Sequence, residues 1–237
     1  MNKDSLPRNP MDVDAIADHL PLLQSIPSHS REQFLALATP QTFAAQTVVI
    51  DQQDWAGSVW FVVQGWVRVS TQVANQEKTL DIFGQGGHLG TMAVFDDYPP
   101  LHQAITLTPT QVVSVSAQRF LQLLLKDPLF QHRLLQLTNQ RIRHLYRRLK
   151  STNQSPQRRV IKTLVYLAES YGKTTERGIE IVALSAKTLA EMVHCEPAIV
   201  HGILEQLVAR GELEIVQDEN YFYLPQLERL HRFSKQF

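Results

Sequence analysis

The sequence is poor in cysteine, in long apolar runs and in net charge. Cys195 is the only cysteine among 237 residues, so one chain can form neither an internal disulfide nor a cysteine-ligated iron–sulfur cluster. No stretch approaches the roughly 18 consecutive apolar residues that a membrane-spanning helix needs. The first 20 residues also lack the apolar core of a secretory signal. We therefore expect a cytoplasmic protein that does not contact membranes.

The sequence also lacks the residue groupings that mark enzymes. It contains no phosphate-binding glycine loop, no His and Cys at metal-ligand spacing, and no nucleophile beside a base and an acid. We therefore expect neither catalysis nor a resident metal or cofactor. Twenty-three Lys and Arg balance 23 Asp and Glu, so the overall charge does not favour nucleic acid either.

Residues 42–120 consist of short β-rich runs separated by Gly, Asn, Asp and Pro, between helical stretches at 11–38 and 117–126. Regular spacing of this kind predicts an antiparallel barrel or sandwich. Trp60 and Phe61 are expected to seal its interior. Gly65 follows an apolar run and precedes another, so it is expected to form the turn of a hairpin.

Residues 127–151 predict one long helix that opens at Asp127-Pro128. Its apolar positions follow the alternating three- and four-residue spacing of a heptad seam over about two repeats. The seam comprises Leu135, Thr138, Ile142, Leu145 and Leu149. Either two copies of the chain pair along this seam, or the helix packs on its own β-domain. We expect the parallel dimer helix.

After a polar hinge at 151–156, residues 185–213 predict a short helix, a tight turn and a longer helix. Ser185 is a suitable N-cap, Pro197 fits the first turn of the second helix, and Gly211 fits the position after its end. Residues 212–216 and 221–224 follow as a hairpin, and 225–237 as a final helix. This order predicts a winged helix-turn-helix, a unit that places a helix in the major groove of DNA.

Three segments together resemble the cyclic-AMP receptor protein / fumarate–nitrate regulator (CRP/FNR) family of bacterial transcription regulators. They are VVIDQQDWAGSVWFVVQGWVRVS, GQGGHLGTMAVFDDYPPLHQAITL and LSAKTLAEMVHCEPAIVHGILEQLVARGELEI. The resemblance implies an α+β fold with a β-roll and N-terminal helices at 1–126, a dimerisation helix at 127–152 and a winged helix-turn-helix at 153–237. It implies a second copy of the chain and duplex DNA as partners, with RNA polymerase or another protein as a further partner.

The resemblance also implies an effector pocket, at which this sequence departs from the family. Members that bind cyclic nucleotides carry a glutamate for the ribose and an arginine for the phosphate. Here Gly90 is followed by Thr91 and Met92, and residues 101–104 read Leu-His-Gln-Ala. The matching pocket residues are Gly90, Thr91, Met92, His102, Gln103, Ala104, Leu145 and Tyr146. We expect no response to cyclic AMP, and either another small ligand, such as an anion at Thr91, His102 and Gln103, or a filled pocket.

The DNA-reading helix departs from the family too. The family presents Ser or Thr, Arg, Glu and a second Arg where this chain has Glu196, Pro197, Ala198 and Gly202, and arginine is the commonest reader of guanine. The remaining candidate DNA contacts are Lys187, Thr188, Pro197, Ala198, Ile199, His201 and Gly202. Residues 151–237 carry ten Lys and Arg against eleven Asp and Glu, and the wing turn at 217–220 is acidic. The chain is therefore either a DNA-binding regulator or a protein-interaction module with the same fold.

Overall fold

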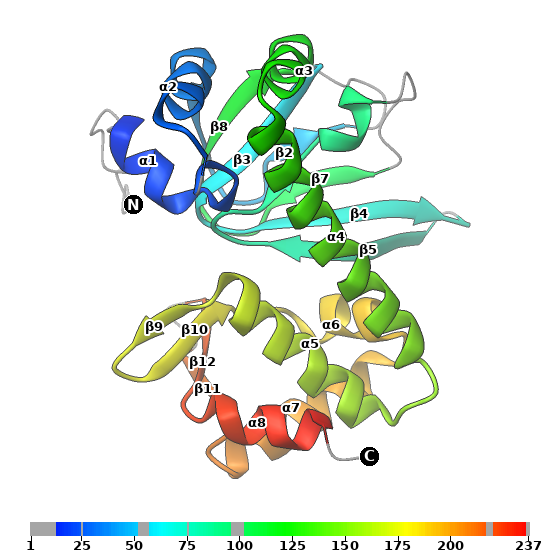
Figure 1. Cartoon of the computed structure of the whole chain (residues 1–237). Coiled ribbons are helices and arrows are strands. Elements are labelled where there is room, and N and C mark those ends of the chain that lie inside the picture. Colours follow the sequence, from blue (N-terminus) through cyan, green and yellow to red (C-terminus); the bar gives the residue numbers. More distant parts are fainter. Residues whose placement is uncertain are drawn as a thin grey trace, which may run out of the picture.

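The structure is a computed structural model that describes residues 13–24, 26–51, 57–74, 76–95, 102–216 and 220–235. Strands dominate its N-terminal part and helices its C-terminal part, and one long helix, α4 (Pro128–Lys150), connects the two (Figure 1). The predicted α+β fold class is confirmed.

Two four-stranded antiparallel sheets form the N-terminal β-roll. The first sheet has the order β1 (Thr39–Phe43), β8 (Thr110–Ser116), β3 (Ser58–Gln64) and β6 (His88–Leu89). The second has the order β2 (Val48–Ile50), β7 (Gln103–Thr106), β4 (Val67–Val73) and β5 (Gln76–Phe83). Apart from the hairpin of β4 and β5, neighbours in these sheets are distant in sequence, which is typical of a jelly roll.

Apolar side chains from both sheets fill the space between them. Trp60, Val62 and Leu89 come from the first sheet and pack with Val69 and Phe83 from the second. Burial of these side chains removes apolar surface from water and so holds the sheets together. The expected role of Trp60 in sealing the interior is confirmed, whereas Phe61 lies on the opposite face of β3, in the core beneath the helices.

Helices cover the outer face of the first sheet, and the sequence of β3 reflects this arrangement. Phe61 points outward into a second core and meets the ring of Phe34 edge-on at 5.2 Å. Because both faces of β3 are covered, its sequence SVWFVVQ is almost continuously apolar. The covering elements are α1 (Val13–His19), η1 (Pro21–Leu23), α2 (Ser28–Leu37), α3 (Ala117–Lys126) and the first turns of α4.

The expected hairpin at Gly65 is wrong. β3 pairs with β8 and β6, whereas β4 pairs with β5 and β7, so Gly65 lies where the chain crosses from one sheet to the other. Its φ of +94° suits glycine, and a Cβ there would lie 2.6 Å from the carbonyl oxygen of Pro109. Glycine is therefore required by the crossover, which a sequence pattern does not distinguish from a hairpin turn.

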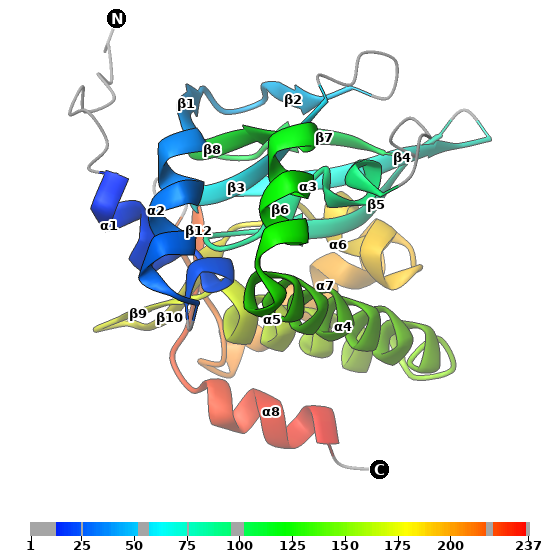
Figure 2. The same cartoon turned by 45° about the horizontal axis from the view of Figure 1, so that its top comes forward.

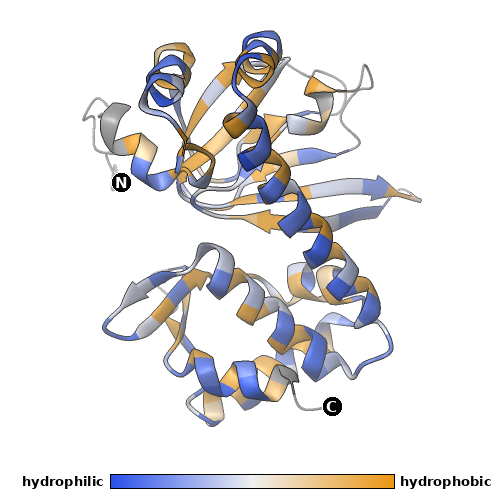
Figure 3. Cartoon of the chain, in the orientation of Figure 1, coloured by the Kyte–Doolittle hydropathy of each residue, from blue (hydrophilic) through white to orange (hydrophobic). Residues whose placement is uncertain are grey.

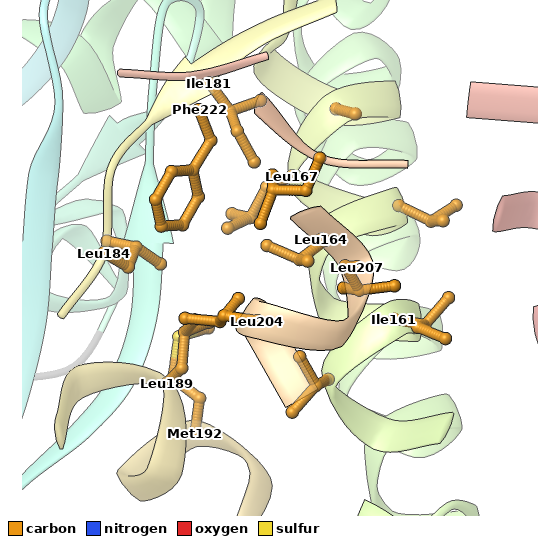
Figure 4. Packing of buried hydrophobic residues seen from close by; sticks show 14 of the residues in the cluster. Ile161, Leu164, Leu167, Ile181, Leu184, Leu189, Met192, Leu204, Leu207 and Phe222 are labelled. Atoms are coloured by element: carbon orange, nitrogen blue, oxygen red, sulfur yellow. The ribbon is translucent and has the colours of Figure 1, made fainter. Parts of the chain in front are cut away.

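The C-terminal part packs helices against a four-stranded antiparallel sheet of order β11 (Glu214–Val216), β12 (Tyr221–Leu224), β10 (Gly178–Val182) and β9 (Lys173–Thr175). Figure 4 shows the core, in which labelled side chains such as Leu164, Leu189, Leu204 and Phe222 point toward one another. The helices are α5 (Pro156–Tyr171), α6 (Ala186–Val193), α7 (Pro197–Ala209) and α8 (Leu227–Lys235). The predicted wing hairpin is present as β11 and β12, while β9 was not predicted.

Candidate nucleic-acid interface and effector region

The helix-turn-helix forms as its sequence predicts. The Ser185 hydroxyl accepts a hydrogen bond from the backbone N–H of Thr188 at 3.1 Å and so caps α6. His194 adopts a left-handed conformation with φ of +53° and ends this helix. Pro197 then occupies the first turn of α7, where its missing N–H has no helical partner to lose. These local signals fix the angle between the two helices.

One face of α7 anchors it and the other faces solvent. Val200, Ile203, Leu204 and Leu207 are buried in the core of the C-terminal part. The predicted contact residues on the opposite side are accessible: Pro197, Ala198, Ile199 and His201 are exposed, and Gly202 is half-buried. A Cβ at Gly202 would meet nothing within 4 Å. The sequence and structure thus agree on which face of α7 is free to meet a partner.

The exposed face of α7 carries little positive charge. The imidazole Nε2 of His201 lies 3.3 Å from a carboxylate oxygen of Glu205, one turn later. Glu196 is exposed at the start of α7, and the helix contains no Lys or Arg. On α6, Lys187 is exposed and Thr188 is half-buried. The acidic wing turn at 217–219 lies outside the described residues.

The β-roll brings together part of the predicted effector region. Thr91, His102 and Ala104 are buried, and Gln103 is half-buried on β7. Gly90 has a φ of +78° and precedes the short helix η2 (Thr91–Val94). Met92 is 57% exposed and does not face the interior. Leu101 lies outside the described residues.

Leu145 and Tyr146 do not join this region within one chain. Both lie on the solvent side of α4, with Tyr146 62% exposed. Arg141 of α4 does approach this region, since its guanidinium lies 4.5 Å above the ring of Phe83 on β5. Arg141 was not predicted to face the β-roll. The available signal was that Arg141 follows the apolar Leu134 by seven residues and so lies on the same stripe of the helix, beside the seam rather than on it.

Arg141 belongs to a buried polar group. Its Nε lies 3.9 Å from Oδ2 of Asp81, a buried carboxylate on β5. Burial raises the pKa of Asp81, against the opposing effect of Arg141 and Arg148. Burial, with the charge of Arg141, also lowers the pKa of His88 to about 4 and lowers that of His102. His102 is therefore neutral near pH 7 and provides one hydrogen-bond donor rather than a positive charge.

The heptad seam of α4 is uncovered along its length. Leu135 is 60%, Ile142 40% and Leu149 68% exposed, and Leu145 and Thr138 are exposed as well. The opposite face packs on the chain through Phe130 and Leu134, among others. Orange and blue segments alternate along α4 in Figure 3, as expected for a helix with separate apolar stripes. Packing on its own β-domain therefore does not account for the seam.

Direct contacts join the β-roll to the helix-turn-helix. Thr79 on β5 donates hydrogen bonds to Oε2 of Glu191 on α6, from its hydroxyl at 2.6 Å and its backbone N–H at 3.1 Å. The Arg148 guanidinium donates to the carbonyl of Leu80 and, at 3.0 Å, to that of Met192. Figures 1 and 2 show α4 beside α5, where His144 stacks on Tyr166. One helix thus contacts both parts of the chain.

Within the residues that the structure describes, no three His, Cys, Asp or Glu side chains gather as a metal site would require. Over the same ranges, no helix combines the length and the apolar character needed to cross a membrane.

Comparison with known proteins gives matches over most of the chain. Residues 40–127 match the cyclic nucleotide-binding domain. The cyclic AMP receptor protein of Thermus thermophilus is 28% identical over 171 residues, 69% of this chain and 77% of that protein. A CRP-like cAMP-activated global transcriptional regulator of Mycobacterium tuberculosis is 24% identical over 74% of this chain and 80% of its own length.

Solved structures show the same fold. The c-di-GMP-responsive global regulator CLP of Xanthomonas campestris superposes with a TM-score of 0.66 at 23% identity, covering 84% of this chain and 99% of that one. The chain places a β-roll, a long helix and a winged helix-turn-helix in that order. Together with these matches, this order leads to one conclusion. The chain is similar to CRP/FNR-type bacterial transcription regulators in both sequence and fold.

Proposed function

We propose that this chain is a homodimeric, DNA-binding transcription regulator of the cytoplasm that does not respond to cyclic AMP. The observation that carries the proposal is the exposed face of α7, which a well-packed core holds rigidly at the surface. A helix fixed in this way suits the major groove of DNA. Candidate contacts are Lys187, Thr188, Pro197, Ala198, Ile199, His201 and Gly202.

The uncovered seam on α4 supports the dimer. An exposed apolar stripe of this kind is unfavourable in water, and a second copy of the same helix would cover it. Pairing along Leu135, Thr138, Ile142, Leu145 and Leu149 would give a two-fold arrangement. Two copies of α7 would then face two half-sites about one turn of DNA apart. RNA polymerase or another protein remains a further proposed partner.

The β-roll supports the proposal that the chain does not respond to cyclic AMP. No carboxylate follows Gly90, and no arginine stands at 101–104 to pair with a cyclic phosphate. The space between the sheets is filled by apolar side chains that include Trp60 and Phe83. Among the relatives, names specify different cyclic nucleotides, so the fold alone does not fix an effector. Isothermal titration with cyclic AMP should give no binding heat.

Binding to a random duplex of about 40 base pairs tests the DNA-binding proposal. Fluorescence anisotropy at several salt concentrations should show affinity that falls as salt rises, because bound phosphates release counterions. Lys187→Gln should weaken binding and make the salt dependence shallower by about one ion. Lys126→Gln on α3 removes the same charge from an exposed site far from α7 and should have no effect (Figure 1). No binding at low salt, or equal loss in both variants, would contradict the proposal.

A protein-interaction module is the second candidate function, and the composition of α7 favours it. Its exposed face combines Ala198, Ile199 and Gly202 with the carboxylates Glu196 and Glu205, and lacks a cation. Such a face suits a protein partner better than phosphates. Under this alternative the purified chain would not be retained on heparin and would bind no duplex, yet would retain a protein partner through α7.

A further inference from the structure

A cleft lies between the β-roll and the C-terminal sheet, apart from the family's effector region. Its volume is about 470 Å³, which is enough for a small molecule. The β-roll side contributes Gln64, Gly65 and Trp66, and the C-terminal side contributes Lys173 and Glu180. None of the predicted effector residues lines it. A molecule bound here would contact both parts of the chain.

The cleft has an aromatic wall shared by both parts. Trp66, just after the crossover at Gly65, meets Tyr171 at the end of α5 edge-on, with ring centroids 6.1 Å apart and an interplanar angle of 81°. Tyr221 on β12 adds a third ring. Aromatic rings arranged in this way favour a flat apolar group, through stacking and edge contacts.

A second wall carries one charge of each sign. Lys173 on β9 and Glu180 on β10 are directly opposite each other in the strand register, and both line the cleft. Within the part of the chain that the structure describes, neither side chain forms an ion pair within 4.0 Å. The carboxylate of Glu180 lies close enough to Tyr221 to help burial raise the pKa of that phenol. Neighbouring charges that do not pair with each other can each pair with a ligand group.

We propose that this cleft binds a small zwitterion with a flat apolar part, the chemistry of an aromatic α-amino acid. The ligand carboxylate pairs with Lys173, its ammonium pairs with Glu180, and its ring packs against Trp66 and Tyr171. The carboxamides of Gln64 and Gln111 lie on adjacent strands of the same cleft and provide further donors and acceptors. Because the walls come from both parts of the chain, a bound ligand favours the arrangement in which they are docked.

Isothermal titration of the full chain with L-phenylalanine tests the proposal without DNA, so its outcome is independent of the proposed function. We expect saturable binding that weakens about tenfold or more for phenethylamine, which lacks the carboxylate, and for 3-phenylpropionate, which lacks the ammonium group. L-tyrosine and L-tryptophan are titrated alongside. The absence of saturable binding by all three amino acids, or equal affinity for the two truncated analogues and L-phenylalanine, would overturn the proposal.

Two variants test whether Lys173 pairs with the ligand carboxylate and Glu180 with its ammonium group. Lys173→Gln should abolish the preference for L-phenylalanine over phenethylamine, and Glu180→Gln the preference over 3-phenylpropionate. Lys126→Gln and Glu176→Gln remove the same charges outside the cleft and should leave both preferences intact. Circular dichroism checks that each variant folds, and if one does not, the analogue series on the unaltered chain still decides. Unchanged preferences in the folded cleft variants would contradict the assignment.

Discussion

Gly202 is the residue at which α7 differs most simply from the recognition-helix pattern of the CRP/FNR family. Glycine there leaves open space on the exposed side of α7, since a Cβ would have no heavy atom within 4 Å. The backbone has an ordinary helical conformation, so other residues fit at little cost. A substitution at this position therefore tests whether DNA approaches this face of α7.

We predict that Gly202→Arg strengthens binding to duplex DNA and steepens its salt dependence by about one ion. The new guanidinium would reach a phosphate or a guanine edge if the groove meets α7. Anisotropy titrations at several salt concentrations measure the effect. Gln118→Arg on α3 adds the same charge at an exposed site far from α7 and is the control. Equal gains in the two variants would show that the effect is general charge rather than contact through α7.

Buried histidines link single residues to the pH dependence of stability. Burial lowers the pKa of His88 to about 4 and that of His144 to about 3, with nearby arginines adding to both effects. The unfolded chain binds these protons below about pH 6.5, whereas the folded chain does not. Asp81 acts in the opposite direction, because its raised pKa lets the folded chain hold a proton at a higher pH than the unfolded one.

The two lowered histidine pKa values outweigh the one raised pKa of Asp81. The free energy of unfolding should therefore fall as pH decreases from about 6.5 to about 4. His144→Phe keeps a ring against Tyr166 and removes the titration, so it should reduce this slope by up to about 1.4 kcal/mol per pH unit. Urea unfolding at a series of pH values measures both slopes. Identical slopes in the two proteins would contradict the burial argument for His144.

Helices whose ends are marked by capping residues could be predicted from the sequence. Features that depend on segments far along the chain could not. Asp127 before Pro128 marks the start of α4, because its carboxylate accepts from the N–H groups of Leu129 and Phe130. Ser185 marks α6 in the same way. At Gly65, by contrast, the strands on either side pair with segments far along the chain. The inward position of Arg141 likewise depends on where α4 meets the β-roll.

Helix α4 packs on the rest of the chain with one face and exposes the heptad seam on another. Ile142→Glu places a charge in the middle of the seam, where a dimer would bury it without a partner. We expect the dimer dissociation constant to rise at least about tenfold by sedimentation velocity. Gln140→Glu adds the same charge at an exposed position on the side of the helix away from the seam and should leave the dimer intact. A chain that is monomeric before any substitution would contradict pairing through α4.

At the scale of the whole molecule, the contact between β5 and α6 connects the β-roll with the helix-turn-helix. Thr79 directs two hydrogen bonds to one carboxylate oxygen of Glu191, and Arg148 joins the carbonyls of Leu80 and Met192. Hydrogen bonds to a charged group contribute more to stability than neutral ones. These contacts therefore hold α6, and with it α7, at one angle to α4.

Glu191→Gln keeps the shape of the side chain and removes its charge, so the contact should weaken while the core of the C-terminal part stays packed. Hydrogen exchange measured by mass spectrometry should become faster in β5 and α6 but not in α5, whose protection comes from the core. Glu176→Gln in the turn between β9 and β10 is the matched control. Unchanged exchange in β5 and α6 would show that the contact does not hold the two parts together.

The proposed function requires above all that two copies of α7 contact one duplex. Selection of binding sites from a pool of random duplexes by the purified chain tests this most directly. The account predicts enrichment of a two-fold symmetric site whose halves are about one helical turn apart. Enrichment of an asymmetric single site, or no enrichment at low salt, would contradict it.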